Sequence, residues 1–252
     1  VMSIKKIEMI NFRNHEDTAF DFSPGINIIW GENGSGKTSI IEAVHILSNG
    51  KSFKTNRLIE TITSNKKEAI VKAVFGDKNM VFHQTKKPSK KIKINNIEKS
   101  TKDLVGKNPT VLVSPEEEKI TKGPHSERRR FFDRVFSNIS KTYFNNLINY
   151  STALKNRNTL LKQQKDKHEI EIWNNPLIKY GCQLWEERKL LHSKFNKNIE
   201  GVCGGYNKKV DITVSLDCPS ETSRNRFKKY LNEKLEKELF LGRTLSGPHL
   251  DK

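Results

Sequence analysis

A glycine-rich segment at residues 31–38, with the sequence GENGSGKT, constrains the fold of this 252-residue chain more than any other feature. It matches the pattern G-x-x-x-x-G-K-[ST] at every constrained position. The near-continuous apolar run Ile26–Trp30 precedes it, and from Lys37 onwards the apolar residues recur at helical spacing. A buried strand, a glycine-rich loop and a helix in this order let backbone N–H groups and the helix N-terminus surround phosphate oxygens. We therefore predict an α/β domain with a phosphate-binding loop (P-loop).

In such a loop Lys37 would reach the β- and γ-phosphates of ATP, and the Thr38 hydroxyl would bind Mg²⁺. The alternative is a glycine-rich turn that begins a helix and binds no ligand. Hydrolysis would also need an acidic residue at the end of a second buried strand. Neither Asp77 nor Asp217 follows such a strand, so we predict no catalytic residue. The candidate nucleotide-binding residues are Gly31, Glu32, Asn33, Gly34, Ser35, Gly36, Lys37 and Thr38.

The residues around the P-loop predict a largely antiparallel β region and one helix. Two strands, Ile4–Phe12 and Ala19–Phe22, precede the apolar run, and the helix after Lys37 has four apolar residues on one face. Lysines near residue 90 are expected at a solvent-exposed hairpin edge. The helix face consists of Ile40, Ile41, Val44 and Leu47, and the later strands are expected at Ala69–Phe75, Met80–His83, Ile92–Ile97 and Thr110–Val113.

The second half of the chain changes to a helical pattern over residues 126–199. A strand at Val210–Leu216, a helix at Ser223–Leu239 and the start of a strand at Phe240–Leu245 follow. The tryptophans are expected in the core rather than as base-stacking platforms. Three parts result: residues 1–115 as an ATPase lobe with the P-loop and the β region, 116–205 as an inserted helical lobe, and 206–252 as an incomplete return to the ATPase lobe. The three tryptophans are Trp30, Trp173 and Trp185.

The charge of the chain favours a polyanionic partner. Lys and Arg number 46 against 29 Asp and Glu, which gives a formal net charge of +17. Neutralising phosphates releases counterions, so nucleic acid is one explanation, and a compositional bias toward lysine is the other. No apolar run approaches the length of a membrane span, and the first residues lack a signal peptide, so we expect a cytoplasmic protein with no membrane partner. The three cysteines form no C-x-x-C pair and are expected to be ordinary reduced thiols.

Six segments, taken together, resemble the RecF family of bacterial DNA replication and repair proteins. The Ser-Pro-Glu to Glu-Arg-Arg-Arg block and the Gly-Pro-His block are far more specific than the P-loop, which many NTPases share. The segments occur in the order of the family and cover nearly the whole chain: Ile10–His15, Gly31–Thr38, Ile41–Phe53, Val113–Glu116 with Lys122–Gly123, Glu127–Asp133 and Ser246–Asp251.

This resemblance implies an ABC-type ATPase head related to the SMC proteins, with a helical second lobe. It also implies an ATP-dependent homodimer that holds ATP and Mg²⁺ and clamps single- or double-stranded DNA. The implied role is DNA replication and recombinational repair at single-strand gaps, with RecO and RecR, to load RecA during DNA damage and the SOS response.

In the family, the signature loop and the acidic Mg²⁺-binding strand come after the Gly-Pro-His segment, where this chain ends. We therefore expect a chain truncated at its C-terminus, and whether it is an enzyme stays open. Two classes of function remain: a DNA-repair ATPase that is cut short, or a truncated ATP- and DNA-binding module without hydrolytic activity.

Two groups of arginines are further candidates. Arg128, Arg129 and Arg130 could contact the phosphate backbone of DNA, or they could form a solvated helix start paired with acidic neighbours. The resemblance implies that Arg13 reaches across to the nucleotide, and its alternative is a loop charge in solvent.

Overall fold

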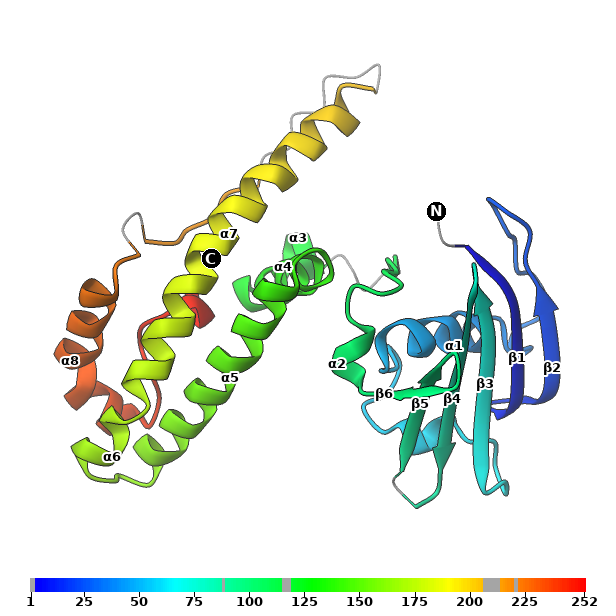
Figure 1. Ribbon diagram of the computed structural model, residues 1–252, viewed down its shortest axis with the longest axis horizontal. Helices are drawn as coiled ribbons and strands as arrows, with labels where there is room; N and C mark the ends of the chain where they lie inside the picture. Colours follow the sequence, from blue (N-terminus) through cyan, green and yellow to red (C-terminus); the bar gives the residue numbers. More distant parts are fainter. Residues whose placement is uncertain (1–2, 88, 115–118, 206–213, 220–221) are drawn as a thin grey trace. The chain divides into compact units, whose positions relative to one another are not determined.

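The computed structural model describes residues 3–87, 89–114, 119–205, 214–219 and 222–252. The chain divides after Val113 into two compact units, drawn in blue to green and in green to red in Figure 1. We call Val1–Val113 the P-loop unit and Ser114–Lys252 the helical unit. The division lies close to the boundary expected at residue 115. Residues 224–252 pack within the helical unit here, and the expected three-part division stays a prediction.

The P-loop unit contains a six-stranded antiparallel sheet in the order β2-β1-β3-β4-β5-β6. Alternating residues of each strand point into the core, as in β3, where Val71 and Phe75 are buried and Lys72 is exposed. The predicted strand at 92–97 is two strands, because Asn95 and Asn96 have positive φ angles and form a two-residue hairpin turn. The strands are β1 (Ile4–Phe12), β2 (His15–Asp21), β3 (Glu68–Phe75), β4 (Lys78–Thr85), β5 (Lys90–Ile94) and β6 (Ile97–Lys99).

Helix α1 (Lys37–Asn49) begins at the predicted residue and packs on β1, β3 and β4. Its buried face includes Ile40, Ala43, Ile46 and Leu47, whereas Ile41, predicted to lie on this face, is 44% exposed. The correction follows from helical geometry, because residues three and four apart share a face and adjacent residues do not. Two short elements, the 3-10 helix Leu58–Thr61 and α2 (Thr101–Leu104), complete the unit.

Two of the predicted strands are absent. Residues 26–30 and 110–113 have no strand conformation, and Ile26, Trp30 and Val111 are 90%, 86% and 87% exposed. The prediction of a buried Trp30 is therefore wrong. An apolar run becomes a buried strand only when a second strand pairs with its backbone. Among the described residues no strand pairs with either segment.

The helical unit is built around the long helices α5 and α7, which pack along each other, with α8 against both (Figure 1). Gly181 in α7 lets Phe227 of α8 approach, because a Cβ at residue 181 would lie 2.6 Å from the Phe227 ring. Phe227 and Trp185 are buried in this core, as predicted, and Trp173 packs against it. The helices are α3 (Lys119–Lys122), α4 (His125–Ile139), α5 (Lys141–Lys162), α6 (Lys167–Glu171), α7 (Asn174–Cys203), α8 (Arg224–Leu241) and the 3-10 helix η3 (Pro248–Leu250).

The end of the chain differs from the prediction. Phe240 and Leu241 belong to α8, which ends at Gly242 with φ 63°, so the predicted strand at 240–245 is wrong. A glycine in the left-handed conformation ends a helix without a steric penalty. Most of the strand predicted at 210–216 lies outside the described residues, and 214–216 are not in a strand. No helix in the described part of the chain is long and apolar enough to cross a membrane.

Candidate nucleotide-binding site

The P-loop joins the exposed segment after β2 to the first turn of α1. Gly31, Gly34 and Gly36 have φ angles of 148°, 86° and 94°, which only glycine adopts without strain. Gly36 is the N-cap of α1, and no side chain caps the helix. The first N–H groups of a helix have no partner within the helix, so those of α1 are available to an anion at the loop.

Lys37, the first residue of α1, folds back over the loop. Its Nζ donates hydrogen bonds of 2.7 Å to the carbonyl oxygens of both Gly31 and Glu32. The ammonium group therefore lies at the loop rather than in open solvent. Thr38 is the next residue of α1 and is exposed, as are Asn33 and Ser35 in the loop. The eight residues predicted from the motif thus form one continuous turn around the start of a helix.

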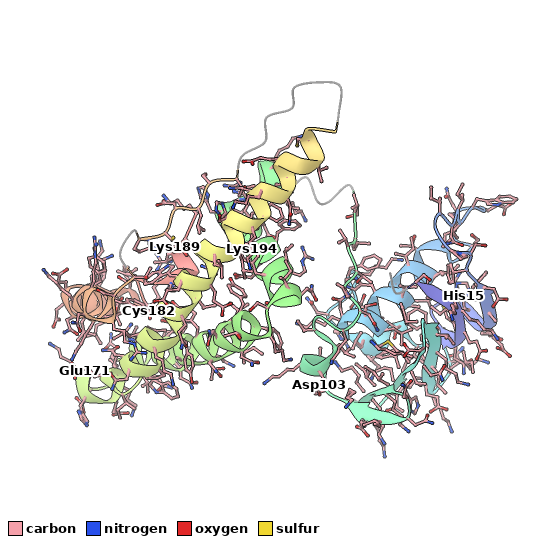
Figure 2. All side chains as sticks on the ribbon, turned by 45° about the horizontal axis from the view of Figure 1, so that its top comes forward. His15, Asp103, Glu171, Cys182, Lys189 and Lys194 are labelled. Atoms are coloured by element: carbon pink, nitrogen blue, oxygen red, sulfur yellow. The ribbon has the colours of Figure 1, made fainter. Side chains whose placement is uncertain are left out.

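Asn14 and His15, in the turn between β1 and β2, hold the P-loop from behind. Asn14 Nδ2 donates to the Gly34 carbonyl oxygen at 2.8 Å, and His15 Nε2 lies 3.2 Å from the Gly36 carbonyl oxygen. A carbonyl oxygen can only accept, so Nε2 carries the proton in this contact. Figure 2 labels His15, a buried residue of the P-loop unit. The sequence reasoning did not identify this role, although both residues belong to a segment that carries the family resemblance.

Arg13 is bound within the P-loop unit. Its Nε and Nη2 donate to Glu42 Oε2 and Oε1 at 2.9 and 2.7 Å, and its Nη1 donates to the Glu60 carbonyl oxygen at 2.8 Å. Glu42, in α1, is fully buried and also accepts a hydrogen bond from Ser52. A bidentate pair of this kind fixes orientation strongly. Arg13 thus anchors α1 to the β1–β2 turn in this structure, and its predicted contact with nucleotide stays a prediction.

Each of the three consecutive arginines of α4 has a partner within the helical unit. Arg128 donates to the Gly123 carbonyl oxygen at 2.9 Å, and Arg129 donates to the Asp251 carbonyl oxygen at 2.6 Å. Burial lowers the pKa of the Arg129 guanidinium. Arg130 is exposed but pairs with Glu127 at 2.7 Å. These contacts favour the paired helix start, and the contact of this triplet with DNA stays a prediction.

A buried ion network in the helical unit was not predicted from the sequence. Arg188 of α7 lies 2.7 Å from both Asp133 and Asp251, and Trp185 Nε1 donates to Asp251 at 3.0 Å. Burial acts to lower the pKa of Arg188, but Tyr143 and the two carboxylates outweigh it and raise that pKa. The network ties the chain end to α7. It joins residues about 60 positions apart, which no local pattern could indicate.

Comparisons with known proteins agree with the fold and the loop. A model of the AAA domain family matches residues 6–241. The DNA replication and repair protein RecF of Alkaliphilus oremlandii is 35% identical over 99% of this chain and 73% of its own length. The chain belongs to the RecF family. The RecF protein of Clostridium novyi is 34% identical, again over 99% of this chain and 72% of its own length.

Two solved RecF structures have the same fold. The structure described as recombination mediator protein RecF-ATPrS in the RecFOR pathway has a TM-score of 0.89 at 29% identity and covers all of this chain and 72% of that one. The corresponding RecF-ATP structure has a TM-score of 0.87 at 30% identity, with the same coverage. The resemblance seen in the sequence is thereby confirmed. The chain is a RecF-like DNA replication and repair protein with an α/β P-loop ATPase fold.

Proposed function

We propose that this RecF-family chain binds ATP at residues 31–38 and binds DNA in the cytoplasm. We further propose that it acts in recombinational repair at single-strand gaps, with RecO and RecR to load RecA, and in the SOS response. The geometry of Gly36 and Lys37 carries the nucleotide part, because a left-handed glycine opens the loop and a lysine lies across it. RecF itself is described with ATP and in the RecFOR pathway, which supports the same proposal.

The residues of the loop fit the phosphates of ATP. A Cβ at residue 36 would lie 2.4 Å from His15 Nε2, so the loop keeps its shape only with glycine there. Lys37 would exchange two carbonyl oxygens for phosphate oxygens, which are stronger acceptors. Thr38 would offer its hydroxyl to Mg²⁺. Within the described residues no group of three or more His, Cys, Asp or Glu could hold a metal ion, so Mg²⁺ at Thr38 would depend on phosphate oxygens.

The DNA part of the proposal rests on charge and on the family. A net charge of +17 favours phosphate contacts that do not depend on sequence. We propose an ATP-dependent homodimer that grips single- or double-stranded DNA.

The second candidate function is binding of ATP and DNA without hydrolysis. One observation favours it: Glu42, the buried carboxylate of α1, is bound to Arg13 and Ser52 and is therefore not available to orient water or a metal ion. Phosphate release measured with and without DNA distinguishes this candidate from an ATPase.

The variant Lys37→Ala tests the ATP proposal. Loss of a charge-assisted contact with phosphate, worth about 1.5–3 kcal/mol, should weaken ATP binding roughly 10- to 100-fold. Titration of a fluorescent ATP analogue measures this loss. Lys54→Ala, at an exposed lysine after α1, is the matched control and should bind as the unmodified chain does. Equal affinity of the Lys37→Ala and unmodified chains would remove the assignment.

A further inference from the structure

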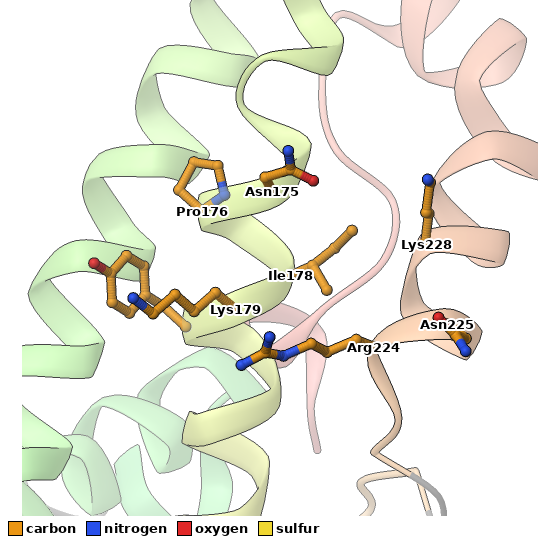
Figure 3. A pocket seen from close by; sticks show the side chains of 8 residues that line it. Asn175, Pro176, Ile178, Lys179, Arg224, Asn225 and Lys228 are labelled. Atoms are coloured by element: carbon orange, nitrogen blue, oxygen red, sulfur yellow. The ribbon is translucent and has the colours of Figure 1, made fainter.

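An open cleft lies between α7 and the start of α8, which we call the α7–α8 cleft (Figure 3). It encloses about 480 Å³, and no Asp or Glu lines it. In Figure 3 Arg224 extends from the start of α8 toward α7, where Lys179 lies. The residues that line the cleft are Asn175, Pro176, Ile178, Lys179, Tyr180, Arg224, Asn225 and Lys228.

The three cations of the cleft, Lys179, Arg224 and Lys228, are exposed. None of the three forms an ion pair with a carboxylate of the described residues, and the Lys179 ammonium lies over the Tyr180 ring at 5.3 Å. By contrast, Lys167 and Lys229 on neighbouring surfaces pair with glutamates of α8. The cleft therefore concentrates positive charge that the described protein does not neutralise.

The start of α8 carries charge of the sign that a helix start disfavours. Its first residues include Arg224, Arg226, Lys228 and Lys229, and its first turn has no acidic residue. The N-terminus of a helix bears a partial positive charge, so cations there are destabilising and anions are stabilising. An anion bound in the cleft would reverse this unfavourable interaction.

We propose that the α7–α8 cleft binds the phosphate backbone of DNA. Cations from two helices face a shared open space, and the amides of Asn175 and Asn225 add hydrogen-bond donors beside them. Side chains of this kind contact phosphate and sugar without reading base sequence. The cleft is open and has no glycine-rich backbone loop, so it suits a chain of phosphates rather than an enclosed nucleotide. This inference rests on the proposed DNA binding and gives it a location other than the Arg128–Arg130 triplet.

A triple variant tests the proposal: Lys179→Gln, Arg224→Gln and Lys228→Gln in one chain, called the cleft variant. The matched control removes the same charge from exposed lysines of the β4–β5 hairpin, with Lys86→Gln, Lys91→Gln and Lys93→Gln. Fluorescence anisotropy with a gapped duplex at several salt concentrations gives the affinity and its salt dependence. The cleft variant should bind about ten-fold or more weakly, and the slope of log K against log salt should fall by about 2–3. The control should keep the slope within about one unit.

The outcomes separate the two levels of the proposal. No DNA binding by the unmodified chain would contradict the proposed function itself. Binding with equal slopes in the unmodified chain and the cleft variant, or equal losses in both triple variants, would overturn only the cleft assignment. Millimolar inorganic phosphate should leave DNA bound; displacement of DNA in the unmodified chain, with phosphate binding lost in the cleft variant, would make this a free-phosphate site. Circular dichroism checks folding, and the single variant Lys228→Gln, with an expected slope change of about 1, replaces a triple variant that fails to fold.

Discussion

Helices α1 and α8 begin in contrasting ways, although phosphate is the proposed ligand at both starts. At α1 the N-cap is Gly36 with φ 94°, no side chain caps the helix, and the one nearby lysine is folded back onto loop carbonyls. At α8 the Ser223 hydroxyl accepts a hydrogen bond from the Arg226 N–H, and cations fill the first turns. The α1 start offers backbone N–H groups in a fixed shape, whereas the α8 start offers mobile side-chain charge.

This contrast predicts different ligands and different sensitivities. A fixed loop of backbone donors can match the geometry of one polyphosphate, so small changes of shape should matter most there. Side-chain cations on long stems adapt to many phosphate positions, so their effect should follow charge and salt rather than shape. Variants that change shape without charge, and charge without shape, test this comparison.

The variant Gly36→Ala should have the largest effect. A left-handed φ costs an alanine about 1–2 kcal/mol, and its Cβ would lie 2.4 Å from His15 Nε2 and 2.8 Å from Asn14 Oδ1. With the overlap added, ATP affinity should fall about 100-fold while DNA binding at low salt stays unchanged. Calorimetric titration with ATP and anisotropy with DNA measure the two effects separately.

Gly201→Ala is the matched control, because a Cβ at residue 201 in α7 meets no atom within 4 Å. It should leave ATP affinity unchanged and stabilise the helix by about 0.5–1 kcal/mol. If Gly36→Ala bound ATP as the control does, shape would not be what distinguishes the α1 start.

The variant Asn14→Ala should have an intermediate effect. It removes the 2.8 Å hydrogen bond from Asn14 Nδ2 to the Gly34 carbonyl oxygen without changing charge. A net loss of about 1 kcal/mol in loop order should weaken ATP binding about five-fold. Asn145→Ala, at an exposed asparagine of α5, controls for the substitution itself. Equal ATP affinities of the two variants would show that the β1–β2 turn does not support the loop.

The sequence indicated the fold wherever local pattern was sufficient. The start of α1, the alternation of β3 and the course of α8 follow from helical and strand periodicity. The apolar run Ile26–Trp30 has the same local signal as a buried strand, yet it is exposed. A buried strand requires a paired neighbour, and pairing is a property of distant segments that periodicity does not report.

The candidate site divides in the same way. The P-loop motif specifies its own geometry because glycine, lysine and the helix start lie within eight residues. The partners of Arg13 and Arg129 are Glu42 and Asp251, which lie 29 and 122 positions away. Consecutive basic residues look alike in a sequence whether they are bound internally or free. Only the packing of α4, α7 and α8 distinguishes the engaged Arg128 and Arg129 from the unpaired Arg224.

The variant Arg224→Gln should have the smallest effect, and it has opposite signs in two measurements. Removing a cation from the first turn of α8 should stabilise the DNA-free protein by about 0.3–1 kcal/mol, and high salt should reduce this gain. The same change should weaken DNA binding a few-fold, because one phosphate contact is lost. Lys237→Gln, toward the other end of α8, removes the same charge and should bring no stability gain. Chemical denaturation at two salt concentrations measures the stabilities. A loss of stability in Arg224→Gln would mean that Arg224 has a structural partner, and the contrast between the two helix starts would then not be one of shape against free charge.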